Sequence, residues 1–362
     1  MKAIIIICVS VALLPSIIHS GSSSDTYSGI YNYVGSSSSS SIGDPDKELN
    51  EAHDRLEVLL KNDGNINNVF KPTKFLGKGG FSVTYLGKML RTDKVVAMKF
   101  SPTFKEDIEN EYAMYTYLGA INNSTVENYG IPTVYYYGKW EDCSMIAITP
   151  LDPQFNQIEE NPEKRSSLTD VDIFIICREY VRISKFIHSR GVCHCDSHLG
   201  NIMFRGNKGF IIDFNSATEL TADSEDCRIS DWRFLLNLCD LAGIEVDWMN
   251  SHRMNAFLKI PNLQRKGLKK VLLEFVRSIY RPPAGQLDYH RMFDIISAEI
   301  QNKGVREPAI LSWLTTEEQK RQAIAEWRRL PTSDIRFIKS IANPYTAQFS
   351  YPPANYSYFA SL

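Results

Sequence analysis

A change in sequence periodicity near residue 150 most constrains the fold of this chain. Before it, short runs rich in β-branched and aromatic residues predict strands at 81–90, 94–100, 133–140 and 144–149, with one helix near 107–120. After it, the strong patterns are helical, at 171–189, 230–243, 263–280, 289–301 and 316–330. This order predicts an α+β protein with two lobes, a small antiparallel β lobe with one main helix and a larger, mainly α lobe.

Length and charge narrow the class of protein further. The chain has 362 residues, of which 43% are hydrophobic and 23% are charged, so it is long and apolar enough to bury the core of a two-lobed protein. The 40 basic and 42 acidic residues give a formal charge of -2, so no bulk field attracts nucleic acid or an anionic membrane. We expect neither as a partner, and we expect a monomer.

The first 20 residues have the composition of a secretory signal peptide. Lys2 precedes an apolar run that Pro15 interrupts and that small residues close near Ser20. A membrane anchor is the alternative, but the run is short for a span. We therefore expect a secreted protein, either extracellular or delivered to a host compartment, with no membrane contact after cleavage.

The remaining segments divide into a linker, two lobes and a tail. Residues 21–45 are rich in Ser and Gly and predict a flexible linker, whereas residues 46–150 and 151–345 carry the two lobes. Residues 47–62 place leucines at helical spacing, which predicts a short amphipathic helix against the first lobe. The aromatic tail, 346–362, has no clear period, so disorder and packing both remain open.

The cysteines and the N-glycosylation sequons bear on whether the protein is exported. Six cysteines remain once Cys8 leaves with the signal, an even number that is compatible with disulfides. Asn122, Asn123 and Asn355 each begin an N-x-S/T sequon. Both features accord with an exported chain, although spacing does not give the disulfide pairing.

Three segments in the first lobe carry the groups that hold a triphosphate. In LGKGGFSVTYLG, three glycines stand between strand-like runs, where backbone amides can approach phosphate oxygens; an ordinary hairpin turn is the alternative. Lys99 lies on the next strand and can point into the same cleft. Twelve residues later Glu111 is the natural ion-pair partner of Lys99, with Glu109 as its rival on another helix face.

The most informative segment is HSRGVCHCDSHLGNIMF. Asp196 and Asn201 have the D-x-x-x-x-N separation of a kinase catalytic loop, which predicts Asp196 as the group that accepts the proton and Asn201 as a magnesium ligand. In GFIIDFNSA, Asp213 follows an apolar strand and precedes Phe214, an arrangement that presents a carboxylate to a metal on the phosphates.

Crowded histidines and cysteines offer a competing interpretation, a zinc site. The candidate ligands are His188, Cys193, His194, Cys195 and His198. Their spacing matches no common zinc pattern, and zinc would leave the other polar motifs unexplained. A disulfide at Cys193 or Cys195 is the better prediction.

Together, in this order over Phe75 to Leu241, these segments resemble the protein kinase superfamily. The first lobe is most similar to the casein kinase one branch, because NEYAMYTYL followed by GIPTVYYYG is similar to that family's helix and following strand. The resemblance selects Glu111 over Glu109. It implies Ile148 as the gatekeeper, Thr149 to Leu151 as the adenine-binding hinge, and Asp231 in SDWRFLL as a brace for the catalytic loop.

The resemblance implies ATP and Mg2+ as cofactors and a protein as the substrate. Lys99, Glu111 and Asp196 would be catalytic, and Asn201 and Asp213 would bind the metal. The residues expected to bind the nucleotide are Leu76, Gly77, Lys78, Gly79, Gly80, Thr84, Ala97, Lys99, Thr149 and Leu151.

Four departures from the family pattern affect the acceptor and regulation. Cys195 stands where HRD has its arginine, so regulation by activation-loop phosphate is not expected. His198 replaces the lysine two residues after the base, as in relatives that phosphorylate small molecules. Asn215 replaces the glycine of DFG, which restricts hinging. Only 18 residues separate Asp213 from Asp231 (231 minus 213), and no APE motif lies between them.

Three functions follow from these motifs. A secreted kinase for Ser or Thr hydroxyls on proteins is the leading one. A small-molecule kinase is the runner-up, favoured by His198 and the short activation segment. A secreted pseudokinase that acts as a binding scaffold is the third, favoured by the altered HRD and DFG surroundings.

Overall fold

The computed structural model describes residues 44–102, 105–152, 155, 161, 163, 166–220, 231, 267–268, 270–272, 274, 288–306 and 308–329. The expected signal peptide, nearly all of the linker, the helix at 230–243 apart from Asp231, and the tail at 346–362 lie outside them. Two compact units divide the chain. The first contains the described residues up to Ser167, with His194–Arg205 and Gly209–Thr218; the second contains Leu168–Cys193, Gly206–Lys208 and the described residues after Thr218.

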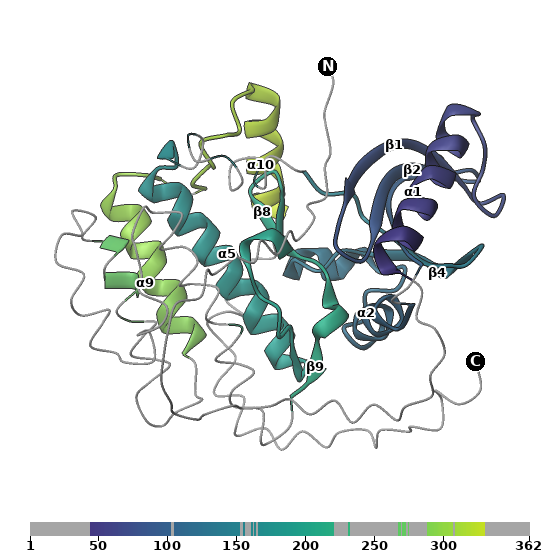
Figure 1. Ribbon diagram of the computed structural model, residues 1–362. Coiled ribbons are helices and arrows are strands. Elements are labelled where there is room, and N and C mark those ends of the chain that lie inside the picture. Colours follow the sequence, from purple (N-terminus) through teal and green to yellow (C-terminus); the bar gives the residue numbers. More distant parts are fainter. Residues whose placement is uncertain are drawn as a thin grey trace, which may run out of the picture. The chain divides into compact units, whose positions relative to one another are not determined.

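A five-stranded antiparallel sheet forms the centre of the first unit (Figure 1). Its strands are β1 (Phe70–Lys78), β2 (Val83–Met89), β3 (Val95–Ser101), β4 (Val134–Trp140) and β5 (Cys143–Ile148), in the order β1-β2-β3-β5-β4. Lys99 on β3 pairs with Thr84 on β2 and with Ile146 on β5. The sequence predicted all four strands after β1.

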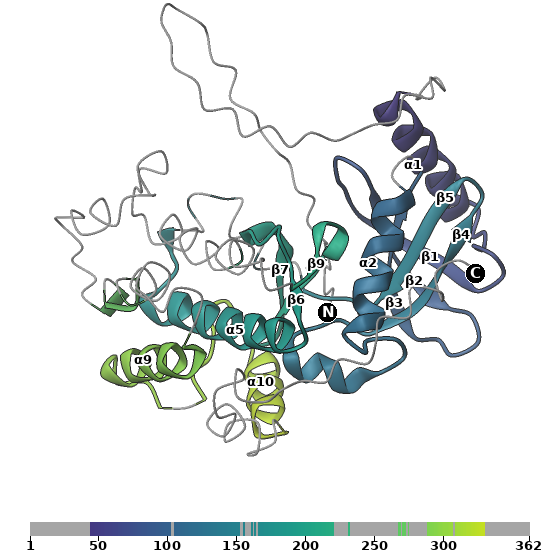
Figure 2. The ribbon, with the colours of Figure 1, turned by 90° about the horizontal axis from the view of Figure 1, so that it is seen from below.

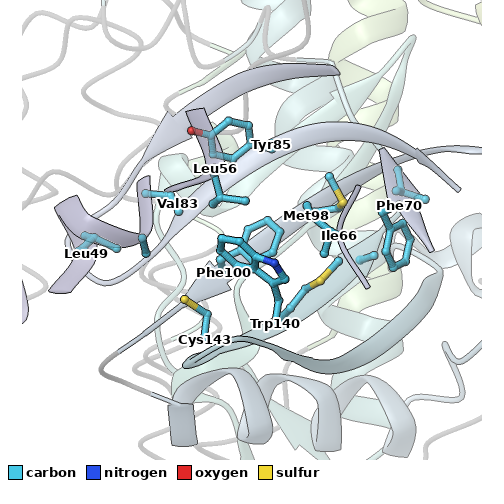
Figure 3. Packing of buried hydrophobic residues seen from close by; sticks show 14 residues of the cluster. Leu49, Leu56, Ile66, Phe70, Val83, Tyr85, Met98, Phe100, Trp140 and Cys143 are labelled. Atoms are coloured by element: carbon cyan, nitrogen blue, oxygen red, sulfur yellow. The ribbon is translucent and has the colours of Figure 1, made fainter. Parts of the chain in front are cut away.

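Alternation along the strands gives the sheet two different faces. Met98 and Phe100 point to one face, where they join the hydrophobic cluster of Figure 3 together with Leu49, Leu56 and Trp140. Lys99 points to the other face. Helix α1 (Pro45–Lys61) covers the hydrophobic cluster, and α2 (Lys105–Tyr117) runs beside β3 and β5 in Figure 2.

Short elements, most of whose residues belong to the first unit, carry most of the polar motifs. The 3-10 helix η1 (Ser124–Tyr129) precedes β4, and η2 (Leu199–Asn201) leads directly into β7 (Ile202–Arg205). Strand β8 (Lys208–Ile211) follows, and the turn η3 (Phe214–Ser216) comes next. Strand β9 (Thr218–Glu219) ends this region.

Helix α5 (Asp170–Ser189) is the main element described in the second unit. It begins with a capping box in which Thr169 and Asp172 bond each other's backbone amides, and most of its residues are buried. Helix α9 (Tyr289–Asn302) packs along it (Figure 2), and this unit also contains β6 (Val192–Cys193) and α10 (Glu317–Arg329). Among the described helices, none combines the length and apolar character that crossing a bilayer requires.

Candidate active site

Lys99 is held between two carboxylates that come from distant parts of the chain. Its ammonium nitrogen lies 2.9 Å from Glu111 Oε2 on α2 and 2.6 Å from Asp213 Oδ1 before η3. Glu111 is almost fully buried, whereas Lys99 and Asp213 remain partly accessible. Burial alone would lower the pKa of Lys99, but Asp213 and Glu111 outweigh it and raise the pKa above its ordinary value. Lys99 is therefore a fixed positive charge.

A pocket of about 130 Å3 opens beside this ion pair, within the first unit. The predicted residues that line it come from the glycine-rich loop, both neighbouring strands, α2 and the two later motifs: Gly79, Gly80, Thr84, Ala97, Lys99, Glu111, Asp196 and Asp213. Ile148, the expected gatekeeper, also lines it. A backbone cradle, a cation and two later carboxylates thus share one space.

Some predicted residues lie outside this lining. Leu76, Thr149, Leu151 and Asn201 are buried in the same unit. Gly77 and Lys78 belong to the end of β1, before the loop. The loop itself closes when the Gly79 amide donates to the Ser82 carbonyl at 2.7 Å.

Asp196 and Asn201 form one hydrogen-bonded unit in the loop before β7. The Asn201 amide group donates to the backbone oxygen of Asp196 at 2.9 Å and to its Oδ2 at 3.3 Å. Its amide oxygen is then the atom that Asn201 can offer a cation. The contact with His198, 3.6 Å from Asp196 Oδ2, is the main cause that lowers the pKa of Asp196, so this carboxylate is ionised and can accept a proton.

The turn that carries Asp213 is fixed by aromatic packing. Asp213 adopts a left-handed backbone with φ 66°, which turns the chain sharply after the apolar run. Phe214 then packs edge-on against Tyr115 of α2 and against His194, with ring centroids 5.0 Å and 4.8 Å away. The side chain of Asn110 on α2 donates to the backbone oxygens of Asn215 and Ala217. Helix α2 therefore positions both Lys99, through Glu111, and Asp213.

The residues around Asp213 suit a hard divalent cation. Such a cation takes oxygen ligands. Asp213 offers a carboxylate and Asn201 offers an amide oxygen, both in the first unit. The segments that carry them are linked, because the backbone amide of Ile212, next to Asp213, donates to the backbone carbonyl of Asn201 at 3.0 Å. The donor set fits Mg2+, and these two residues would hold it.

A buried polar network supports the predicted hinge, and the sequence analysis missed it. Glu127 Oε1 accepts from the hydroxyls of Thr149 at 2.6 Å and Thr133 at 2.7 Å, while its Oε2 lies 2.7 Å from Arg205. Burial tends to raise the pKa of Glu127, yet these hydrogen bonds prevail and lower it. In the sequence Glu127 stands in a polar loop, where nothing distinguishes it from a solvated residue.

Asp107 and Ser101 also line the pocket without having been predicted. Asp107 precedes Glu111 by one helical turn, so the 3.6-residue period places both on one face of α2. Ser101 shares a strand face with Lys99, and its hydroxyl donates to the Phe81 carbonyl at 2.9 Å, at the tip of the glycine-rich loop. Period counting from Lys99 and Glu111 could have found both.

The described cysteines do not show the predicted disulfide. No disulfide joins any two of Cys143, Cys177, Cys193 and Cys195, and the other cysteines lie outside the part of the chain that the structure describes. An even cysteine count carries no information on which thiols lie close enough to pair. Cys195, in the place of the HRD arginine, has φ 63° and lies 3.4 Å from the Thr218 hydroxyl.

Two of the five candidate zinc ligands, His188 and Cys193, lie close together, and the third residue beside them is Asp231, which was not among the candidates. His188 and Cys193 meet Asp231 in the second unit, with their possible ligand atoms within 4.8 Å of one another. However, His188 already uses both ring nitrogens: Nε2 lies 2.8 Å from Asp231 Oδ2, and Nδ1 contacts the Tyr289 hydroxyl. His188 and Asp231 therefore form a buried hydrogen-bonded pair that supports α5.

Comparison with known proteins agrees with this geometry. Residues 70–234 match the protein kinase domain family, a range that includes Lys99, Glu111, Asp196, Asn201 and Asp213. Residues 70–234 belong to the protein kinase superfamily. The matched range begins at β1, so α1 lies before it.

Two known proteins are similar to parts of this chain. The chain is similar to Casein kinase I homolog 2 of Schizosaccharomyces pombe (strain 972 / ATCC 24843), with 26% identity over 150 residues. That match covers 39% of this chain and about a third, 32%, of the relative. The fold is similar to a structure of vaccinia related kinase 3, with a TM-score of 0.51, 12% identity, and coverage of 66% of this chain and 88% of the other. The predicted kinase-like α+β fold and the casein kinase relationship are confirmed.

Proposed function

We propose that the chain is an ATP- and Mg2+-dependent kinase that phosphorylates Ser or Thr hydroxyls on proteins. One observation carries the proposal: Lys99 is paired to both Glu111 and Asp213 in a pocket that the glycine-rich loop and Asp196 also line. Phosphoryl transfer depends mainly on positioning and on electrostatic stabilisation, and these groups supply both. The similarity to a casein kinase I homolog supports a Ser/Thr acceptor.

Each side chain has a separate task in this mechanism. Lys99, held by Glu111, binds the α and β phosphates, and backbone amides of the glycine-rich loop bind phosphate oxygens. Asn201 and Asp213 would hold a magnesium ion, which when bound would neutralise charge on the phosphates. Asp196, an ionised carboxylate, orients the acceptor hydroxyl and accepts its proton.

A small-molecule acceptor is the second candidate, and His198 favours it. His198 occupies the position two residues after Asp196, and its Nδ1 accepts the Gly200 amide at 3.1 Å. Its imidazole is thus held beside the proposed base, in the place where a lysine is typical of Ser/Thr protein kinases. This difference lies on the acceptor side and leaves the nucleotide groups intact.

The decisive experiment measures transfer from γ-labelled ATP by residues 21–362. The acceptors are a panel of Ser, Thr and Tyr peptides and, separately, a metabolite extract. We expect Mg2+-dependent labelling of Ser or Thr that Asp196→Asn abolishes. Labelling of metabolites alone would establish the small-molecule kinase, and ATP binding without transfer to any acceptor would establish the pseudokinase.

We also propose that residues 1–20 are a cleaved secretory signal. Their charged start and short apolar run support this. Expression of the full chain in a secretory host, followed by N-terminal sequencing of protein from the medium, tests it. Retention in the cells with Met1 intact would contradict it.

A further inference from the structure

Helix α1 lies before the matched kinase range, yet it packs on the two strands that flank the glycine-rich loop. We propose that Asn50, His53 and Glu57 of α1 are positioning residues for this loop, which they hold in the conformation that binds the triphosphate. The inference rests on the proposed function, because it concerns how the same pocket binds ATP. Under this proposal α1, which the kinase family match does not include, contributes to ATP binding.

The sequence builds α1 as a well-defined amphipathic helix. Asp44 caps it by accepting the Asp46 amide at 3.1 Å, and Pro45 occupies the first turn, where no amide donor is needed. Leu49, Ala52 and Leu56 are buried in the cluster of Figure 3, against Val83 and Tyr85 of β2. This apolar contact fixes the helix on the outer face of the sheet.

Polar contacts then connect α1 to both ends of the loop. Asn50 Oδ1 accepts a hydrogen bond from the ammonium of Lys78, the last residue of β1. On β2, the Tyr85 hydroxyl lies 2.7 Å from His53 Nδ1 and 3.0 Å from Glu57 Oε1. The loop residues 79–82 are therefore bracketed by two strand ends that the same helix holds.

These contacts reach the pocket through the alternation of the strand. Tyr85 faces α1, so its neighbour Thr84 faces the opposite side, where it lines the pocket and pairs with Lys99. The ring of His53 also packs on Phe75 of β1, with centroids 4.7 Å apart. Movement of α1 would therefore shift both strands, and with them the amides at Gly79 and Gly80, while the hinge side of the pocket is left in place.

The test compares two ligands that differ only in the triphosphate. The double variant Asn50→Ala/His53→Ala should bind ATP about tenfold more weakly. The reason is that the fraction of molecules whose glycine-rich loop has the ATP-binding conformation falls by that factor. Adenosine does not contact the phosphate loop, so its Kd should change by less than about twofold. Both constants are measured by calorimetry on residues 21–362.

A matched control lies on the same helix. Lys47 and Glu51 form an ion pair whose side chains are 72% and 56% exposed, and Lys47→Ala/Glu51→Ala should leave both constants unchanged. If the first double variant does not fold, Tyr85→Phe removes only the hydroxyl and should give the same selective loss for ATP. Equal losses for ATP and adenosine, or unchanged ATP affinity in a folded variant, would overturn the inference. Wild-type protein that binds no ATP would instead refute the proposed function.

Discussion

The carboxylate of Asp213 lies 2.6 Å from the ammonium of Lys99, although 114 residues separate them in the sequence. This contact joins β3 to the turn that follows the apolar segment 209–212. A charged pair assembled from such distant segments beside a pocket is the arrangement that phosphoryl transfer requires.

Asp213→Asn should abolish transfer without unfolding the protein. Asn keeps the shape and tolerates the left-handed backbone at this position, but it removes the negative charge that would hold magnesium. We expect kcat to fall by about a thousandfold or more, with the free energy of unfolding within about 1 kcal/mol of wild type. Retention of wild-type turnover would contradict the metal assignment.

Glu111→Gln should separate orientation from charge at Lys99. Loss of one of its two carboxylate partners should lower kcat/KM for ATP by about a hundredfold, because the ammonium no longer has a fixed position. Glu109→Gln is the matched control on an exposed face of the same helix and should behave as wild type. Steady-state kinetics at saturating acceptor measures both, and equal effects would refute the pairing.

Glu127→Gln should destabilise the first unit by about 2 kcal/mol, because the variant loses the charge that pairs with Arg205. The pKa of Glu127 is lowered, so its stabilising effect is present above the ordinary carboxyl pKa and is lost as the pH falls. The difference in Tm between wild type and variant should therefore be largest near neutral pH and shrink in acid. Exposed Glu163→Gln should show no such difference, and a gap that persists in acid would contradict the network.

Lys185→Met should stabilise the second unit near neutral pH. Burial lowers the pKa of Lys185 to about 8, with Asp288 offsetting part of this effect. Because the unfolded chain binds this proton more tightly, the wild type gains stability from this group as the pH rises from about 8 toward 10.5. The Tm advantage of the variant should thus be greatest below pH 8 and diminish above it. An advantage that does not depend on pH would contradict this assignment.

Much of the fold and the core of the site could be predicted because local patterns carry them. The alternation around Lys99 gave β3, and the leucine spacing gave α1. The Glu127 network could not be predicted, because it joins η1, the hinge and β7, which no sequence period relates. Likewise, no disulfide pairing could be predicted, because the number of cysteines does not say which thiols approach each other.

At Asp213 the left-handed backbone lowers the stability of the protein, whereas the side chain is needed for activity. A residue with a Cβ costs about 1 kcal/mol in this conformation, and glycine would relieve that cost. Glycine would also remove the carboxylate on which the chemistry depends. A laboratory evolution scheme that rewards heat resistance alone should therefore enrich glycine at this position and yield robust but inert enzymes, whereas one that also screens turnover should keep the aspartate and find its gains elsewhere.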